Sequence, residues 1–82
     1  MTEQITWVRA RDIVRGDTVD AGATYGATPD HDVFIVEGVR MTTTTTGKIV
    51  ELLGGSHPNR PRPHVLVEAR PTAKIAVVIK KG

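Results

Sequence analysis

The chemistry-bearing side chains of this 82-residue chain are concentrated near its C-terminal end. Residues 57–64 hold two arginines, two histidines and three prolines, and the prolines stiffen the backbone toward an extended conformation. Guanidinium and ammonium groups bind phosphate oxygens through charge-assisted hydrogen bonds. The pattern therefore predicts a site for nucleic acid or another anion, in which backbone contacts dominate over base reading. Its residues are Arg60, Arg62, Arg70, Lys74 and Lys80.

Few side chains of this sequence could serve in catalysis. The chain has no cysteine and one serine, Ser56, whose neighbour His57 lies with it in a proline-rich loop without the third group and rigid scaffold of a triad. Asp30, His31 and Asp32, with His57 or His64, supply oxygen and nitrogen donors, but their spacing matches no standard metal site. We expect no enzyme, no catalytic residue, no metal or other cofactor and no small-molecule substrate.

Composition indicates a single all-β domain over residues 1–82. Valine, isoleucine and threonine together make 28 residues, and branching at Cβ favours strands over helices. No segment approaches the roughly 20 apolar residues of a membrane-spanning helix, so we expect no membrane partner. The first residues lack a secretory signal, and the absence of cysteine fits a reducing compartment, so we expect a cytoplasmic protein.

Charge is uneven along the chain. Residues 1–40 carry a net charge of −3 and residues 41–82 a net charge of +5. A basic half attracts polyanions. In a small domain, however, the two halves interleave in space, so this asymmetry leaves open whether a basic surface forms.

Apolar runs and turn residues predict five or six strands. They cover residues 5–8, 18–19, 33–41, 48–53, 64–70 and 73–81, with one helical turn at 10–14 and a long exposed loop at 21–32. Gly16 suits the left-handed backbone of a reversal, and Gly38 suggests a bulge or tight bend within its strand. The five threonines at 42–46 either extend a strand or form the turn that Gly47 completes.

The last two strands are predicted to form a hairpin. A three-residue connection pairs Ala69 with Ile75 and Val67 with Val77, which gives one wholly apolar face. On the opposite face this register leaves Leu66 and Val78 exposed, and the strand at 33–41 begins with apolar residues on both faces. We therefore predict a protein interface at Val33, Ile35, Leu66 and Val78. The predicted core is Trp7, Val8, Ile13, Val19, Phe34, Val36, Val50, Val65, Val67, Ile75, Val77 and Ile79.

Residues 10–19, Ala-Arg-Asp-Ile-Val-Arg-Gly-Asp-Thr-Val, resemble the A-x-D-[LI]-x-x-G-D-x-V opening of small SH3-like β-barrel domains. Such domains recur in uncharacterised bacterial and bacteriophage proteins. There the helical turn leads through Gly-Asp into the first barrel strand. The resemblance implies a small SH3-like barrel, or a strongly curved antiparallel sheet, and no catalytic residue.

Two functions are consistent with the sequence. The first is a non-enzymatic protein-interaction or assembly module that associates with itself or with another protein, because edge pairing would add buried area to a small core. The alternative is a weak nucleic-acid-binding barrel without sequence preference. The three aromatic residues are too few to build a groove for proline-rich peptides.

Overall fold

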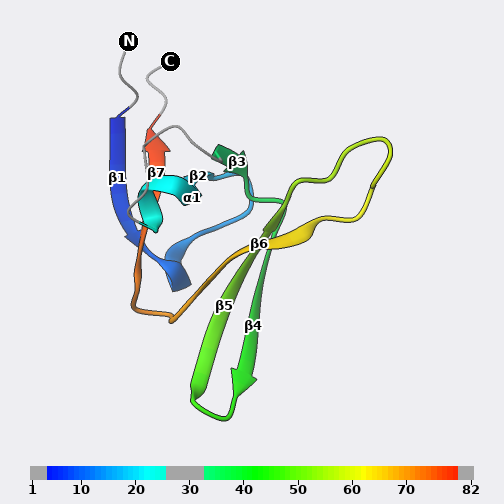
Figure 1. Ribbon diagram of the computed structural model, residues 1–82. Coiled ribbons are helices and arrows are strands. Elements are labelled where there is room, and N and C mark those ends of the chain that lie inside the picture. The colour runs from blue at the N-terminus through cyan, green and yellow to red at the C-terminus, as the bar shows by residue number, and fades with distance from the viewer. Residues whose placement is uncertain (1–3, 26–32, 80–82) are drawn as a thin grey trace.

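Figure 1 shows the computed structural model of the protein, in which residues 4–25 and 33–79 are described. The all-β class is confirmed, because strands make up most of these residues. The elements in chain order are β1 (Gln4–Arg9), the 3-10 helix η1 (Ala10–Asp12), β2 (Thr18–Asp20), α1 (Ala21–Thr24), β3 (Val33–Ile35), β4 (Gly38–Thr44), β5 (Gly47–Gly54), β6 (His64–Ala69) and β7 (Lys74–Ile79). The predicted helical turn at 10–14 corresponds to η1.

The strands form two antiparallel sheets. One sheet has the order β1-β7-β2-β3, and the other has the order β4-β5-β6. We call them the four-stranded and the three-stranded sheet. Within the described residues the sheets keep separate strand orders and do not join into one closed barrel. The expectation of five or six strands is too low by at least one, because the predicted strand at 33–41 is two strands in different sheets.

The chain passes from one sheet to the other at Val36 and Glu37. Val36 still bonds to the segment before β2, since its N–H donates to Asp17 O at 2.8 Å and its carbonyl accepts from Gly16 N at 2.8 Å. The next residue changes partner, because the Glu37 N–H donates to Leu53 O of β5 at 2.7 Å. The expected bend at Gly38 therefore lies just before it.

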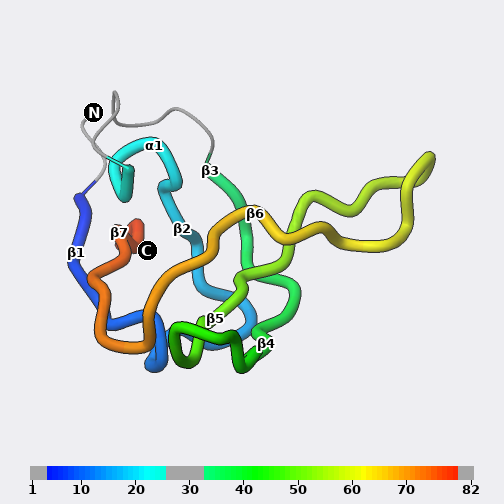
Figure 2. The backbone as a smooth tube through the Cα atoms, turned by 60° about the horizontal axis from the view of Figure 1, so that its bottom comes forward, coloured from blue at the N-terminus to red at the C-terminus, as the bar shows by residue number. Residues whose placement is uncertain are grey.

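A second passage between the sheets occurs in the turn at residues 70–73, and it overturns the predicted hairpin. The turn itself exists, with Ala73 N donating to Arg70 O at 2.9 Å. After it, however, β7 pairs with β1 and β2, whereas β6 pairs with β5. Figures 1 and 2 both place this turn beside η1. Two backbone bonds hold it there, from Ala10 N to Ala73 O at 2.8 Å and from Arg11 N to Pro71 O at 3.1 Å.

The core lies between the two sheets. The apolar faces of β6 and β7 do meet the same core, but from opposite sheets rather than as neighbours in one hairpin. The buried core residues are Ala10, Ile13, Val19, Ala21, Val36, Val50, Leu52, Val67, Ile75 and Val77, with Val8, Phe34 and Ala69 packed against them. Seven of the twelve predicted core residues are thus buried, and Val8, Phe34 and Val65 are partly buried.

Three of the predictions about burial are wrong. Trp7 and Ile79 were expected in the core, but they are 51% and 43% exposed because β1 is an edge strand and Ile79 ends β7. Val78 was expected on the surface, but it is only 6% exposed. The reason is that β7 is an inner strand, flanked by β1 and β2 and contacted by α1.

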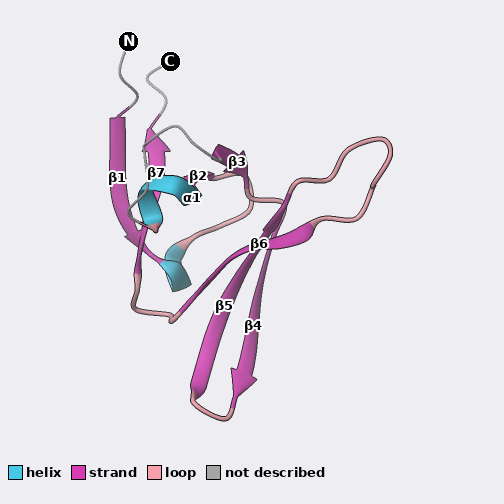
Figure 3. Cartoon of the chain, in the orientation of Figure 1, coloured by secondary structure: helices cyan, strands magenta, loops and turns pink. Residues whose placement is uncertain are grey.

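Helix α1 occupies the start of the segment that was predicted to be a long exposed loop (Figure 3). Asp20 caps it by accepting from Ala23 N at 2.9 Å. Thr24 ties the helix to β7, because its hydroxyl oxygen accepts from Ala76 N at 3.0 Å. The exposed-loop prediction is therefore wrong for residues 21–24, and the rest of that loop from 26 to 32 lies outside the described residues.

The threonine run at 42–46 both extends a strand and forms a turn. Thr42, Thr43 and Thr44 belong to β4, and Thr45 and Thr46 form the two-residue turn to β5. Gly47 has φ of 127°, and Gly16 has φ of 99°, so both adopt the left-handed region that favours glycine.

Gly54, at the end of β5, lies close against β3 of the other sheet. A Cβ at this position would lie 2.7 Å from Phe34 Cδ2 and 2.9 Å from the Ile35 carbonyl oxygen. The missing side chain thus lets the end of β5 approach the backbone of β3. Beside Gly54, β6 carries a bulge: Leu52 pairs with Val67 and Leu53 with Val65, so Leu66 has no opposite residue.

We expect Gly54→Ala to destabilise the fold by about 1–3 kcal/mol, because the backbone of β3 cannot yield as a flexible side chain would. Urea unfolding followed by circular dichroism measures this loss. Gly38→Ala is the matched control, since an added Cβ there meets nothing within 4 Å. Equal stability of the two variants would contradict the close-approach interpretation.

Candidate interaction surfaces

The structure divides the five predicted anion-binding residues. Arg60 and Arg62 lie in a long protrusion between β5 and β6, whereas Arg70 and Lys74 lie at the turn between β6 and β7. Lys80 lies outside the described residues. Strand β6 separates the two groups, and Figures 1 and 2 show them at opposite ends of it. The four described residues, Arg60, Arg62, Arg70 and Lys74, are therefore not one surface.

We call the protrusion, residues 55–63, the arm. In Figures 1 and 2 it extends away from both sheets. Its tip is a tight turn in which His57 N donates to Arg60 O at 2.9 Å and Arg60 N donates to His57 O at 2.8 Å. The His57 ring takes part, since its Nδ1 accepts from Asn59 N at 3.1 Å. The arm contains no carboxylate, so its two arginines give it a positive charge.

Glu37 holds the base of the arm. Its carboxylate accepts from both the backbone N–H of Ser56, at 2.9 Å, and the Ser56 hydroxyl. The hydroxyl bond, the backbone bond and the nearby charge of Arg15 together keep the pKa of Glu37 below its ordinary value. The side chains of Ser56 and Glu37 are thus used to fix the arm where it leaves β5.

Four cations gather at the other end of β6, and we call them the cationic end: Arg9, Arg11, Arg70 and Lys74. Arg9 stands directly opposite Lys74 in the ladder between β1 and β7. Arg11 joins them through the backbone bond from its N–H to Pro71, next to Arg70. All four side chains are exposed, with Asp12 and Glu68 as the nearest carboxylates along the chain.

Sequence reasoning found only half of the cationic end. Arg9 and Arg11 belong to the acidic N-terminal half, and only the pairing of β1 with β7 brings them to Arg70 and Lys74. The exposed Trp7 lies two residues before Arg9 on the same strand, so both side chains lie on one face of the sheet. The surface therefore combines positive charge with an accessible aromatic ring.

Most of the predicted protein interface forms one surface around β3. Val33 and Ile35 are 39% and 57% exposed on the outer edge strand of the four-stranded sheet. They line an open groove of about 620 Å³, whose other lining residues are Thr18, Phe34, Glu37, Gly55 and Ser56. The apolar side chains of the groove come from β3 itself, and its polar side chains come from β2, from Glu37 and from the base of the arm.

Leu66 adjoins this groove through the bulge of β6. Its Cδ1 atom lies 3.3 Å from the position of a Cβ on Gly54, and Phe34 touches the same position from the other sheet. Leu66 is 39% exposed, as predicted. We call Val33, Ile35 and Leu66 the β3 surface. Val78, the fourth predicted interface residue, is buried in the inner strand β7 and does not belong to it.

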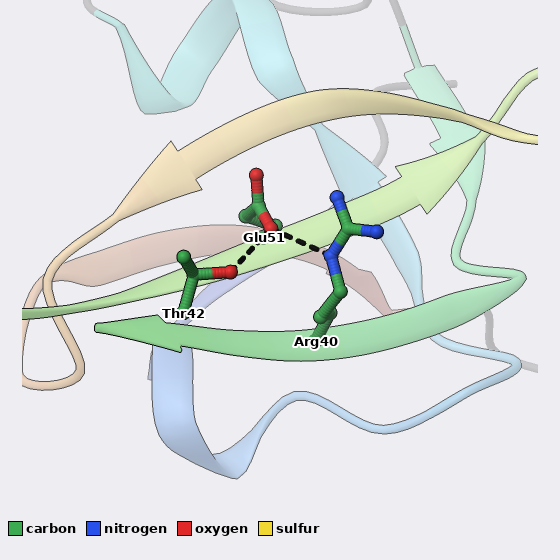
Figure 4. A network of polar contacts seen from close by, with 3 residues as sticks. All are labelled: Arg40, Thr42 and Glu51. Atoms are coloured by element: carbon green, nitrogen blue, oxygen red, sulfur yellow. Dashed lines mark hydrogen bonds and ion pairs between the residues drawn. The ribbon is translucent and has the colours of Figure 1, made fainter. Parts of the chain in front are cut away.

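The three-stranded sheet carries a polar network on its outer face, shown in Figure 4. Glu51 accepts from Arg40 Nε and from the Thr42 hydroxyl, both at 2.7 Å on the same oxygen. The bond from Arg40, followed by that from Thr42, lowers the pKa of Glu51. On its other side Glu51 stands opposite Glu68, a like-charge pair that would be unfavourable without Arg40. We therefore assign this network to stability.

The described residues contain neither a metal-binding cluster nor a membrane-spanning helix. Among residues 4–25 and 33–79, no group of three or more histidine and acidic side chains is arranged to hold a metal ion, and residues 30–32 lie outside this range. The helices of the described residues are too short to cross a bilayer. Comparison with protein-family models, with curated proteins and with solved structures gives no match.

The lowered pKa of Glu37 predicts a pH-dependent contribution to stability. Because the folded state favours the carboxylate, the contribution is complete above the ordinary pKa of 4.5 and is lost as the pH falls through the lower folded pKa. Urea midpoints measured between about pH 7 and pH 3 should show the wild type losing its advantage over Glu37→Gln in that window. Ser56→Ala should reduce this difference, and an advantage independent of pH would contradict the assignment.

Proposed function

We propose that this protein is a non-enzymatic interaction module that self-associates through the β3 surface. The observation that carries the proposal is an edge strand whose side chains are apolar and exposed, Val33 and Ile35, beside an apolar residue of the other sheet, Leu66. An edge strand has unpaired backbone groups that another strand can pair with. The β3 surface thus offers both hydrogen-bonding groups and apolar area to a partner.

A second copy of the chain is the partner that fits this surface best. Two β3 surfaces related by a two-fold axis would bring the exposed Val33 and Ile35 side chains of one copy against those of the other. The two strands carry no charged residue, so the pairing brings no like charges together. A chain this short buries only about 60–65% of its unfolded surface on folding, and association would add to this buried area.

We also propose that the two sheets represent an open form of the small SH3-like barrel. In support, η1 leads through Gly16 and Asp17 into β2, as the sequence resemblance implies. The strands are short, antiparallel and arranged around one core.

Nucleic-acid binding is a second candidate function, and the cationic end is the observation that favours it. Four exposed cations from β1, η1, the turn before β7 and the start of β7 lie together, and only two carboxylates are close to them in sequence. Such a surface neutralises phosphates without reading bases. The arm is a separate, smaller positive region with two arginines.

Self-association should be visible as a mass that rises with concentration in sedimentation equilibrium. Ile35→Lys should abolish the rise, because it places a charge in the centre of the proposed contact, and Leu66→Lys should weaken it. Met41→Lys is the control, since Met41 is equally exposed but lies in β4 of the other sheet. A wild type that stays monomeric at millimolar concentration would rule out the proposal, and loss of association in Met41→Lys alone would place the interface on β4.

Nucleic-acid binding is tested by fluorescence anisotropy with labelled DNA and RNA. If three or four cations contact phosphates, raising the salt from about 50 to 200 mM should weaken binding to a single strand roughly 20- to 50-fold. The double variant Arg9→Glu, Lys74→Glu should abolish binding, and Arg60→Glu, Arg62→Glu should change it little. The reverse ranking would assign binding to the arm, and binding insensitive to salt would exclude a phosphate-binding surface.

A further inference from the structure

Trp7 lies on the edge of the four-stranded sheet with no role in the core. In the ladder between β1 and β7, Trp7 stands opposite Ala76, and Arg9 stands opposite Lys74. Residues that face each other in an antiparallel ladder share a face of the sheet, as do residues two apart on one strand. Trp7, Arg9 and Lys74 therefore project from the same face, which is opposite to the face that Val8 and Ile75 turn to the core.

The pairing of Arg9 with Lys74 is unfavourable in the protein alone. Like charges directly opposite each other in a ladder repel, and among the described residues the one ion pair is that of Arg40 with Glu51. A bound anion between the two cations would convert this repulsion into attraction. Because Cβ atoms directly opposite in a ladder lie about 4.5–5.5 Å apart, the oxygens of a single phosphate group can accept from both side chains.

The ring of Trp7 extends this anion site into a site for a nucleotide. Trp7 and Lys74 are diagonal neighbours across the ladder, a relation that brings Cα atoms to roughly 7–8 Å. A base stacked on an exposed aromatic ring, with its phosphate on adjacent cations, is the usual contact of proteins that bind single strands. Trp7 is half exposed, so part of its ring is accessible to a base.

We propose that Trp7, Arg9 and Lys74 form a binding site for single-stranded nucleic acid, in which Trp7 stacks on a base and the two cations bind the adjoining phosphate. This inference rests on the second candidate function and specifies its site and its ligand. A duplex cannot use the site fully, because its bases are already stacked on one another. The preference for a single strand therefore depends on Trp7, whereas the affinity for phosphate depends on Arg9 and Lys74.

Trp7 is the one tryptophan of the chain, so its own fluorescence reports stacking. Titration with an oligothymidylate of about 10 nucleotides, the length that a small single-strand site covers, should quench the emission. A duplex of the same length should bind more weakly and quench little. In anisotropy experiments with the labelled oligothymidylate, Trp7→Ala should weaken binding about 5- to 150-fold, and Trp7→Phe should retain most of the affinity.

The controls separate this inference from the function on which it rests. Arg60→Glu, Arg62→Glu should leave the quenching unchanged, because the arm lies at the other end of β6. If Arg9→Glu, Lys74→Glu abolishes binding while Trp7→Ala does not, the cationic end binds nucleic acid but stacking is refuted. Inorganic polyphosphate that competes as well as the oligonucleotide would also refute the base contact, and no binding at all would refute both.

Discussion

The crossing of the backbone from one sheet to the other at Val36 and Glu37 determines how the rest of this small structure is arranged. Two successive N–H groups bond in opposite directions, one to the segment before β2 and the next to β5. The two sheets are thus joined by adjacent peptide units and cannot separate without breaking backbone bonds. Gly54 makes this arrangement possible, since any side chain there would meet the β3 carbonyl that precedes the crossing. These backbone contacts fix how the two sheets are placed relative to each other, and the side chains then fill the core between them.

The same crossing positions the surfaces with functional potential. It places β3 at the edge of the four-stranded sheet while bringing it against Gly54, so that Leu66 of the other sheet borders it. It also places Glu37 where its carboxylate can hold Ser56 and thereby the base of the arm. At the far end, the second passage between sheets returns the chain to η1 and assembles the cationic end. The surfaces thus lie next to the connections between sheets.

The pattern of apolar and turn residues predicted where most strands lie, but it did not predict correctly which strands pair with each other. The apolar patterns of β6 and β7 identified most of their inward-facing residues, because the period of two is a property of each strand alone, whereas the fully buried Leu52 of β5 was missed. The predicted partner of β7 was wrong because a hairpin with β6 satisfies the same pattern, whereas in the structure β7 pairs with β1 and the turn before it bonds to Ala10 and Arg11. Helix α1 was not predicted, because its alanines and glycine show no helical periodicity of apolar residues. The exposure of Trp7 and the burial of Val78 follow from strand order, which no local pattern contains.

The two edges of the four-stranded sheet differ in a way that separates the two proposed functions. Strand β1 ends in Arg9 opposite Lys74, and positive charge on an edge disfavours pairing with another positively charged edge. Strand β3, at the other edge, has no charged residue, so the proposed association between copies would favour that edge. Self-association through β3 would leave β1 free in both copies, with Trp7 exposed on each. A pair joined in this way would carry two cationic ends on its outer edges, and two such sites on one strand would bind it more tightly than either alone.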